Sequence, residues 1–114
     1  MVTINGNGGN DTIKSHNAEF VLINGGKGND SLWGGSGSDT FIYANGGGKD
    51  VVYNFGNDDA LQLGGDFTAT VNNNSIAFKV GSTANALTLK DYTATELNIN
   101  GDTYQISGST LAKK

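Results

Sequence analysis

Residues 25–33 read GGKGNDSLW, and residues 34–42, which follow without a gap, read GGSGSDTFI. Both segments are copies of one nine-residue unit: two glycines, any residue, a glycine, any residue, an aspartate, and three residues with a large apolar side chain in the middle. A glycine-rich turn and a short apolar strand that repeat at a fixed period are typical of chains that coil into stacked rungs. This repeat decides the fold that we expect for the rest of the chain.

Four weaker units surround the two intact copies. The first and the fifth keep the aspartate and most of the glycines, and an insertion of two residues, Tyr43 and Ala44, precedes the fifth. The second has neither glycine nor aspartate in its turn, and the sixth keeps one glycine. In chain order these units are GNGGNDTIK (6–14), SHNAEFVLIN (15–24), NGGGKDVVY (45–53) and NFGNDDALQ (54–62).

The spacing of the apolar residues predicts how the units stack. If each full coil contains two units, alternate units lie above one another, and the large residues of each series are buried between two parallel sheets. The period of 19 or 20 residues defines two such series, with Ile23, Tyr43 and Leu63 extending the second. The first series is Ile13, Leu32 and Val52, and the second is Val21, Phe41 and Leu61.

A different pattern begins near residue 64. Apolar and polar residues alternate with period two, and Asn72–Asn73–Asn74, Gly81 and Asn100–Gly101 interrupt the alternation. Such a pattern predicts antiparallel hairpins. Because an open end of a coil exposes unpaired strand edges, we interpret these hairpins as a cap. The prediction is an all-β chain: a parallel β-roll at 1–63, an antiparallel β cap at 64–107 and a loose tail at 108–114.

Composition excludes several classes of function. The chain has 114 residues, enough for one domain, with Lys+Arg 7 against Asp+Glu 11 and no arginine. It therefore lacks the basic footprint of a nucleic-acid-binding protein. The absence of cysteine excludes disulfides and thiolate metal sites. No apolar run is long enough to span a membrane, so no membrane span is expected.

The glycines point to a bound cation. Twelve of the 18 glycines lie in residues 1–50, so this half of the chain loses much backbone entropy on folding and offers few apolar residues in return. A bound ion can supply the missing free energy. Calcium binds six to eight oxygens at about 2.3–2.6 Å, from carboxylates and backbone carbonyls. A glycine-rich turn that ends in aspartate presents both kinds of ligand, so two stacked turns form a cage.

The repeat resembles that of the repeats-in-toxin (RTX) family of secreted bacterial proteins, which carry hemolysin-type calcium-binding nonapeptides. The resemblance extends over about residues 2–63. It implies that two or three calcium ions lie between turns of alternate units, each held by turn carbonyls and the closing aspartates. The positions that it marks as metal ligands are Gly6, Gly8, Gly9, Asp11, Gly25, Gly26, Lys27, Gly28, Asp30, Gly34, Gly35, Ser36, Gly37, Asp39, Gly46, Gly48, Asp50, Asp58 and Asp59.

Under this resemblance the two sides of the coil differ. On one side the first turn faces the third, with Gly6, Gly8 and Asp11 opposite Gly26, Gly28 and Asp30. The third turn in the same way faces the fifth, with Gly25, Lys27 and Asp30 opposite Gly46, Gly48 and Asp50. That side is expected to hold two sites. On the other side the turn of Gly34, Ser36 and Asp39 has Asp58 or Asp59 ahead of it and only the degenerate turn at 15–20 behind it, so at most one site is expected there.

The resemblance also implies a biological setting. The chain would be the C-terminal part of a larger bacterial protein that leaves the cell unfolded through type I export and folds on calcium binding outside. Calcium and the rest of the parent polypeptide, on the N-terminal side, are the expected partners. A carbohydrate-binding or adhesive module, in which calcium is only structural, is the alternative. No catalytic activity is expected, because no nucleophile or acid–base pair stands out.

Other interpretations of individual residues remain open. The glycine-rich stretch could be a flexible linker, and its aspartates could be ordinary turn formers. No EF-hand loop or phosphate-binding loop matches the sequence. His16 has no second histidine or cysteine to form a zinc site, and Asp58–Asp59 could be an acid–base pair. Trp33 and Tyr53 are expected to lie side by side on the outer surface, where they could bind a glycan or the parent protein, or pack under the cap.

Overall fold

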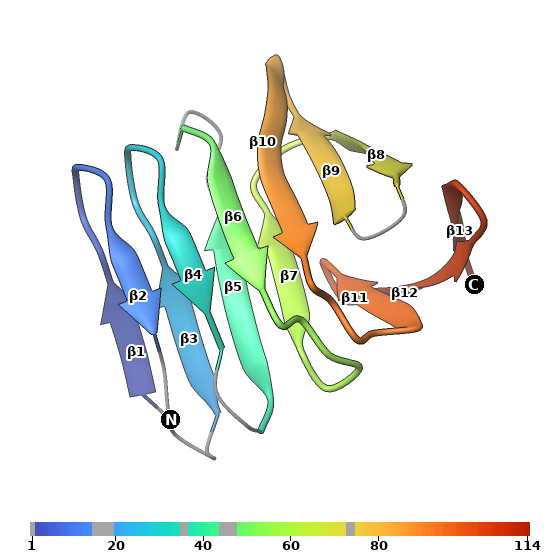
Figure 1. The fold of residues 1–114 in the computed structure, drawn as a ribbon, viewed down its shortest axis with the longest axis horizontal. Helices are drawn as coiled ribbons and strands as arrows, with labels where there is room; N and C mark the ends of the chain where they lie inside the picture. The colour runs from blue at the N-terminus through green and yellow to red at the C-terminus, as the bar shows by residue number, and fades with distance from the viewer. Residues whose placement is uncertain (1, 15–19, 35–36, 44–47, 73–74) are drawn as a thin grey trace.

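The computed structural model describes residues 2–14, 20–34, 37–43, 48–72 and 75–114, which form strands and no helix (Figure 1). The strands are β1 (Val2–Asn5), β2 (Thr12–Lys14), β3 (Val21–Asn24), β4 (Ser31–Trp33), β5 (Asp39–Tyr43), β6 (Asp50–Tyr53), β7 (Ala60–Leu63), β8 (Phe67–Val71), β9 (Ser75–Val80), β10 (Thr83–Lys90), β11 (Glu96–Ile99), β12 (Asp102–Ser107) and β13 (Thr110–Lys113).

The strands belong to two sheets. Sheet A has the order β1-β3-β5-β7-β11-β12-β13, and sheet B has the order β2-β4-β6-β10-β9-β8. From β1 to β7 the chain alternates between the sheets, so that each strand pairs in parallel with the strand two places later. Figure 1 shows this coil with sheet B in front of sheet A. The predicted all-β parallel β-roll is therefore confirmed.

The register of sheet B agrees with the predicted stacking. Ile13 pairs with Leu32, and Leu32 pairs with Val52. Leu32 and Val52 are fully buried, and Ile13 at the open edge is half-buried. The apolar residue in the middle of each short strand therefore supplies the core of each rung.

The register of sheet A differs from the predicted one between β3 and β5. Ile23, and not Val21, pairs with Phe41, while Val21 pairs with Asp39. The reason is the length of the two intact nonapeptides, which place equivalent residues 18 positions apart rather than 20. The insertion of Tyr43 and Ala44 then lengthens the next coil, and Phe41 pairs with Leu61 and Tyr43 with Leu63 as predicted.

The C-terminal half continues both sheets of the roll. The first strand added to each sheet is parallel to its neighbour: β10 pairs with β6, and β11 with β7. Antiparallel pairing follows, in β8-β9-β10 and in β11-β12-β13. Asn100 and Gly101 join β11 to β12 with positive φ values of 53° and 86°, as expected for a two-residue hairpin turn.

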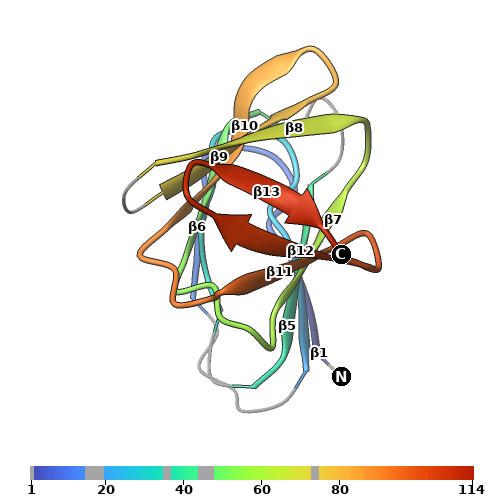
Figure 2. The same ribbon diagram turned by 90° about the vertical axis from the view of Figure 1, so that its right-hand side faces the viewer.

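The predicted loose tail is wrong for residues 110–113. They form β13, which pairs with β12 after a turn at Gly108, whose φ is 61°. Leu111 lies opposite Ile106, and both side chains pack against the core, which holds the strand in place. Figure 2 shows β12 and β13 at the end of the molecule opposite β1.

The core runs without interruption from the roll into the cap. Phe41, Phe55, Phe78, Leu87 and Leu97 are each 0% exposed. Phe41 lies beside Phe55, with ring centroids 6.0 Å apart. Within the described part of the chain, no helix could cross a membrane.

Candidate metal centre

The turns of the roll lie on two flanks. The first flank, at the top of Figure 1, carries the turns that lead from sheet A to sheet B: 6–11, 25–30 and the described residues 48–50 of the fifth turn. The second flank, at the bottom, carries the turns that lead back: 34–39, without 35–36, and 54–59. Each flank is therefore a stack of turns, one above the next.

The closing aspartates of the first flank form a ladder. The backbone N–H of Asp11 donates to Oδ1 of Asp30 at 2.8 Å, and the N–H of Asp30 donates to Oδ1 of Asp50 at 3.0 Å. Asp30 and Asp50 are 1% and 2% exposed. One oxygen of each carboxylate thus fixes the spacing of two turns, and Asp30 takes part in both links.

A second ladder runs beside the first. The N–H of Asn29 donates to Oδ1 of Asn10 at 2.8 Å, and the N–H of Lys49 donates to Oδ1 of Asn29 at 2.9 Å. Sequence reasoning missed these asparagines because it treated their position as variable. The signal was present, since asparagine precedes the aspartate in both turns.

The glycines allow the turns to approach one another closely. A Cβ atom on Gly26 would lie 1.9 Å from the carbonyl oxygen of Asn7, and one on Gly28 would lie 2.2 Å from that of Gly9. Both glycines also have positive φ, 77° and 99°. Only glycine satisfies both conditions.

These contacts shift the glycine pairing expected from the sequence. Asn7 and Gly9, rather than Gly6 and Gly8, face Gly26 and Gly28, although Asp11 and Asp30 pair as expected. Gly6 instead approaches the carbonyl of Gly25, and a Cβ atom on Gly8 would meet nothing within 4 Å. Gly8 holds the same place in its turn as the exposed Lys27, so the chain faces solvent there.

Two carboxylate oxygens of the first flank have no hydrogen-bond partner among the described residues. They are Oδ2 of Asp11 and Oδ2 of Asp30, and both atoms are buried. Burial raises the pKa of Asp30, and it raises the pKa of Asp50 to about 7, with the charge of Asp30 adding to the effect. Buried anionic oxygens without donors are costly. A hard cation among these oxygens and the turn carbonyls removes that cost, so this donor set fits calcium.

The second flank is built differently at its last turn. Asp59 accepts hydrogen bonds on both oxygens, from the N–H of Asp39 at 2.9 Å and from the N–H of Gly56 at 2.9 Å. The carbonyl of Phe55 accepts the N–H groups of Thr93 and Ala94 at 2.9 and 3.2 Å. Both carboxylate oxygens of Asp59 and the Phe55 carbonyl therefore already have protein donors in this turn.

Asp39 is the exception on the second flank. It is 1% exposed, and neither of its carboxylate oxygens has a hydrogen-bond partner among the described residues. Burial, together with the charge of Asp59, raises the pKa of Asp39 to about 6. Val21 occupies the position below it where the first flank has an aspartate. Asp39 is therefore linked to Asp59 on one side, as Asp11 is linked to Asp30, but it pairs with Val21 rather than with an aspartate on the other side.

The other predicted ligands lie in several places. Gly34 approaches Oδ2 of Asp39 as Gly25 approaches that of Asp30, and the φ values of Gly37 and Gly48 are 95° and 89°. Asp58 is exposed. Gly35, Ser36 and Gly46, as well as His16 and the rest of 15–19, lie outside the described residues. No cluster of three or more His, Cys, Asp or Glu side chains occurs among the residues described, so a candidate site depends on backbone carbonyls.

The aromatic pair on the outer face of sheet B is stacked, as predicted. The rings of Trp33 and Tyr53 have centroids 4.3 Å apart and planes that differ by 9°. Nζ of Lys14 lies 4.8 Å from the centroid of the Trp33 ring. In register, the row across sheet B is Lys14, Trp33, Tyr53 and Lys90. The rings of Trp33 and Tyr53 therefore stack on each other, and Lys14 and Lys90 are their neighbours on the adjacent strands.

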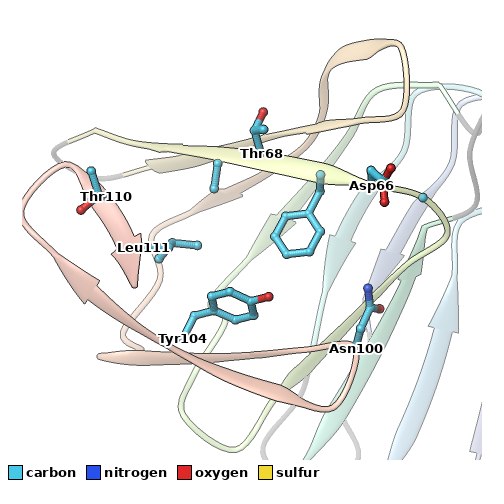
Figure 3. Close-up of a pocket in the computed structure, with 9 residues that line it drawn as sticks. Asp66, Thr68, Asn100, Tyr104, Thr110 and Leu111 are labelled. Carbon is cyan, nitrogen blue, oxygen red and sulfur yellow. The ribbon is translucent and has the colours of Figure 1, made fainter. Parts of the chain in front are cut away.

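A cleft of about 700 Å³ opens between β8 and the hairpin β12–β13 (Figure 3). Phe67 and Tyr104 line it with rings in an edge-to-face arrangement, 5.8 Å apart. Asp66 is the one carboxylate of its lining, and the side chain of Asn100 is bonded to the backbone of Leu63. The lining therefore contains no acid–base pair.

Comparison with known proteins assigns the repeats. The family model for the RTX calcium-binding nonapeptide repeat matches in four copies, over residues 2–16 and 22–50. The gap falls on the degenerate turn, and the match ends before the turn at 54–59. No curated protein and no solved structure matches the chain.

Proposed function

Because residues 2–16 and 22–50 match the RTX calcium-binding nonapeptide repeat, which supports a calcium-binding module, we propose that the roll folds when calcium binds outside the cell. In this proposal the module is non-catalytic. It stabilises a larger secreted bacterial protein and assists its export, and it joins the rest of that polypeptide on its N-terminal side. The observation that carries the proposal is the pair of buried carboxylate oxygens, on Asp11 and Asp30, that no donor in the described part of the chain reaches.

The proposed ligands come from the first flank. One ion is held between the turns 6–11 and 25–30, and a second between 25–30 and the fifth turn. Asp11, Asp30 and Asp50 supply carboxylate oxygens, and the glycine turns supply carbonyls. A bound calcium ion supplies two positive charges to a site whose own side chains are anionic.

The free energy of calcium binding is large enough to switch the roll from unfolded to folded. Calcium sites of extracellular modules have dissociation constants of about 10⁻⁴–10⁻³ M, far above the free calcium inside a cell. At about ten times its dissociation constant each site adds roughly 1.4 kcal/mol of stability. Without calcium, the carboxylates that the fold brings together oppose folding through burial and mutual repulsion. In this proposal, calcium binding changes the contribution of the first flank to the free energy of folding from unfavourable to favourable.

A calcium titration followed by circular dichroism and by the fluorescence of Trp33, the one tryptophan of the chain, tests the proposal. The strand signal and the environment of Trp33 are expected to change together at about 10⁻⁴–10⁻³ M calcium. A chelator is expected to reverse both changes, and magnesium at the same concentration is the control. A strand signal that is complete in chelator and unaffected by calcium contradicts the proposal.

Glycan binding at Trp33 and Tyr53 is the weaker candidate. A sugar packs on the open face of an aromatic ring, and here Tyr53 covers one face of Trp33 while the ammonium group of Lys14 lies over the ring. We expect titration with neutral glycans to give no binding. Trp33→Ala is expected to cost about 0.5–1.5 kcal/mol of stability beyond the lost buried area, the usual value of an aromatic pair. Saturable glycan binding that Trp33→Ala removes would restore this candidate.

A further inference from the structure

The first flank ends in a contact that the repeat does not contain. The carbonyl oxygen of Gly9 points at Gly28, and that of Gly28 points at Gly48, each 2.2 Å from the place where a Cβ atom would stand. The carbonyl of Gly48 has no further turn to point at. It accepts a hydrogen bond instead, from the hydroxyl group of Tyr43 at 2.6 Å.

Tyr43 reaches this carbonyl from the core. It lies at the end of β5, it is 1% exposed, and its backbone carbonyl accepts the N–H of Gly64 at 2.8 Å. A buried tyrosine hydroxyl needs a partner, because leaving it unsatisfied is costly. The residue belongs to the two-residue insertion that breaks the nonapeptide period, so its position is not one that the repeat supplies.

The hydroxyl group of Tyr43 is a hydrogen-bond donor to Gly48, the last carbonyl in the stack of first-flank turns. Without this donor, the Gly48 carbonyl would lose the hydrogen-bond partner that the described residues give it. Because a carbonyl has two lone pairs, the bond from Tyr43 fixes the direction of the Gly48 peptide and leaves one lone pair free. The adjacent N–H of Lys49 is bonded to Oδ1 of Asn29, so the orientation of this peptide is transmitted to the third turn.

We propose that Tyr43 is a positioning residue at the end of the calcium-binding stack of turns. Its hydroxyl group bonds the last carbonyl of the first flank, that of Gly48, and holds residues 48–50 in place for the ion between 25–30 and 48–50. This inference rests on the calcium-dependent folding proposed above. It limits the first flank to two ions, and it makes the second site, but not the first, depend on a side chain outside the nonapeptide pattern.

The test is Tyr43→Phe, which keeps the buried ring and removes the hydroxyl group. Calcium calorimetry is expected to show two ions, with the affinity of one site about three- to tenfold weaker, the effect of one lost hydrogen bond. In calcium-saturated protein, hydrogen exchange of the Lys49 amide is expected to accelerate while that of the Asn29 amide stays unchanged. Tyr53→Phe, which alters a ring on the outer face, is the matched control and is expected to change neither amide.

Equal weakening of both sites, equal acceleration of both amides, or no change in either overturns the proposal. If Tyr43→Phe does not fold in calcium, the wild-type chain decides. The hydroxyl proton of Tyr43 is expected to exchange slowly and to show a nuclear Overhauser contact to Gly48 in the calcium-loaded state, and absence of that contact overturns the proposal. A wild-type chain that binds no calcium refutes the proposed function itself, whereas a wild-type chain that binds two ions beside an unchanged Tyr43→Phe refutes only the role of Tyr43.

Discussion

The two flanks of the roll are built from the same sequence unit, but they satisfy their oxygens in different ways. On the first flank, Asp11 and Asp30 each keep a buried oxygen that no donor among the described residues reaches. On the second flank, both oxygens of Asp59 in the last turn accept backbone N–H groups, whereas Asp39 in the turn before it has no donor among those residues. The need for an ion therefore differs from turn to turn. The repeat turns that end in Asp11, Asp30 and Asp39 keep unpaired anionic oxygens, and the last turn of the second flank does not.

The largest effect is expected from Asp30→Ala. Asp30 links three turns, because its Oδ1 accepts from the N–H of Asp11 and its own N–H donates to Asp50. Its Oδ2 has no hydrogen-bond partner within the described ranges and is a proposed ligand of the ion. We expect the calcium midpoint of folding to rise more than tenfold, which corresponds to at least about 1.4 kcal/mol. Circular dichroism during a calcium titration measures it. Asp58→Ala, at an exposed position on the second flank, is the control and is expected to leave the midpoint unchanged.

Glycine substitutions on the first flank distinguish the contribution of close turn packing to stability from the contribution of ion binding. Gly26→Ala places a methyl group 1.9 Å from the carbonyl of Asn7 and strains a φ of 77°. Loss of several kcal/mol is expected, about 3 or more, because the atom that it meets belongs to the backbone. Gly8→Ala meets nothing within 4 Å, so it is expected to be neutral or to stabilise by up to about 1 kcal/mol. Thermal unfolding in saturating calcium measures both, and equal losses in the two variants would refute the stacking described here.

The sequence predicted the first flank well because the nonapeptide itself dictates it. Glycines at fixed positions and one aspartate per turn determine which turns stack, and the ladder of Asp11, Asp30 and Asp50 follows from that. The strand registers that depend on loop length were harder to predict. The pairing of Ile23 with Phe41 required counting two intact nonapeptides, and the degenerate unit before them obscured that count.

Contacts with the cap could not be predicted. The N–H groups that donate to the Phe55 carbonyl and to Oδ1 of Asn57 belong to residues 93–96, about 38 positions later. No local sequence pattern predicts such a pairing. The prediction that Asp59 binds calcium did not take into account its two N–H donors, which come from Asp39 in the neighbouring turn and from Gly56 in its own turn. β13 was missed because its strand pattern is short and follows a turn of small polar residues.

A smaller effect, with an informative sign, is expected from Asp39→Asn on the second flank. Burial raises the pKa of the Asp39 carboxyl to about 6, and no described residue donates a hydrogen bond to it, so its ionised form opposes folding at neutral pH. The amide removes that charge without changing the shape of the side chain. In chelator the variant is expected to be more stable than wild type, and in calcium its midpoint is expected to change less than threefold. A tenfold rise of the midpoint would show that this flank also carries an essential ion.

In the absence of calcium, the stability of the folded chain is expected to depend on pH. Burial raises the pKa of Asp39 to about 6 and that of Asp50 to about 7, above the value of about 3.9 in the unfolded chain. The folded chain therefore binds more protons between about pH 4 and pH 7, and its stability falls as the pH rises through this range. Acidification should increase the residual strand signal of the metal-free chain, measured by circular dichroism after dialysis against a chelating resin. Because calcium needs the ionised carboxylates, acid should raise the calcium midpoint at the same time.

The central claim is that ions are held between the turns of the first flank and not by the closing turn of the second. Calorimetric titration of calcium into the wild-type chain, Asp30→Ala and Asp39→Asn tests it most directly. We expect two ions for wild type, two for Asp39→Asn and fewer than two for Asp30→Ala. A wild-type chain that binds none, or an Asp30→Ala variant that keeps both ions at unchanged affinity, would contradict it.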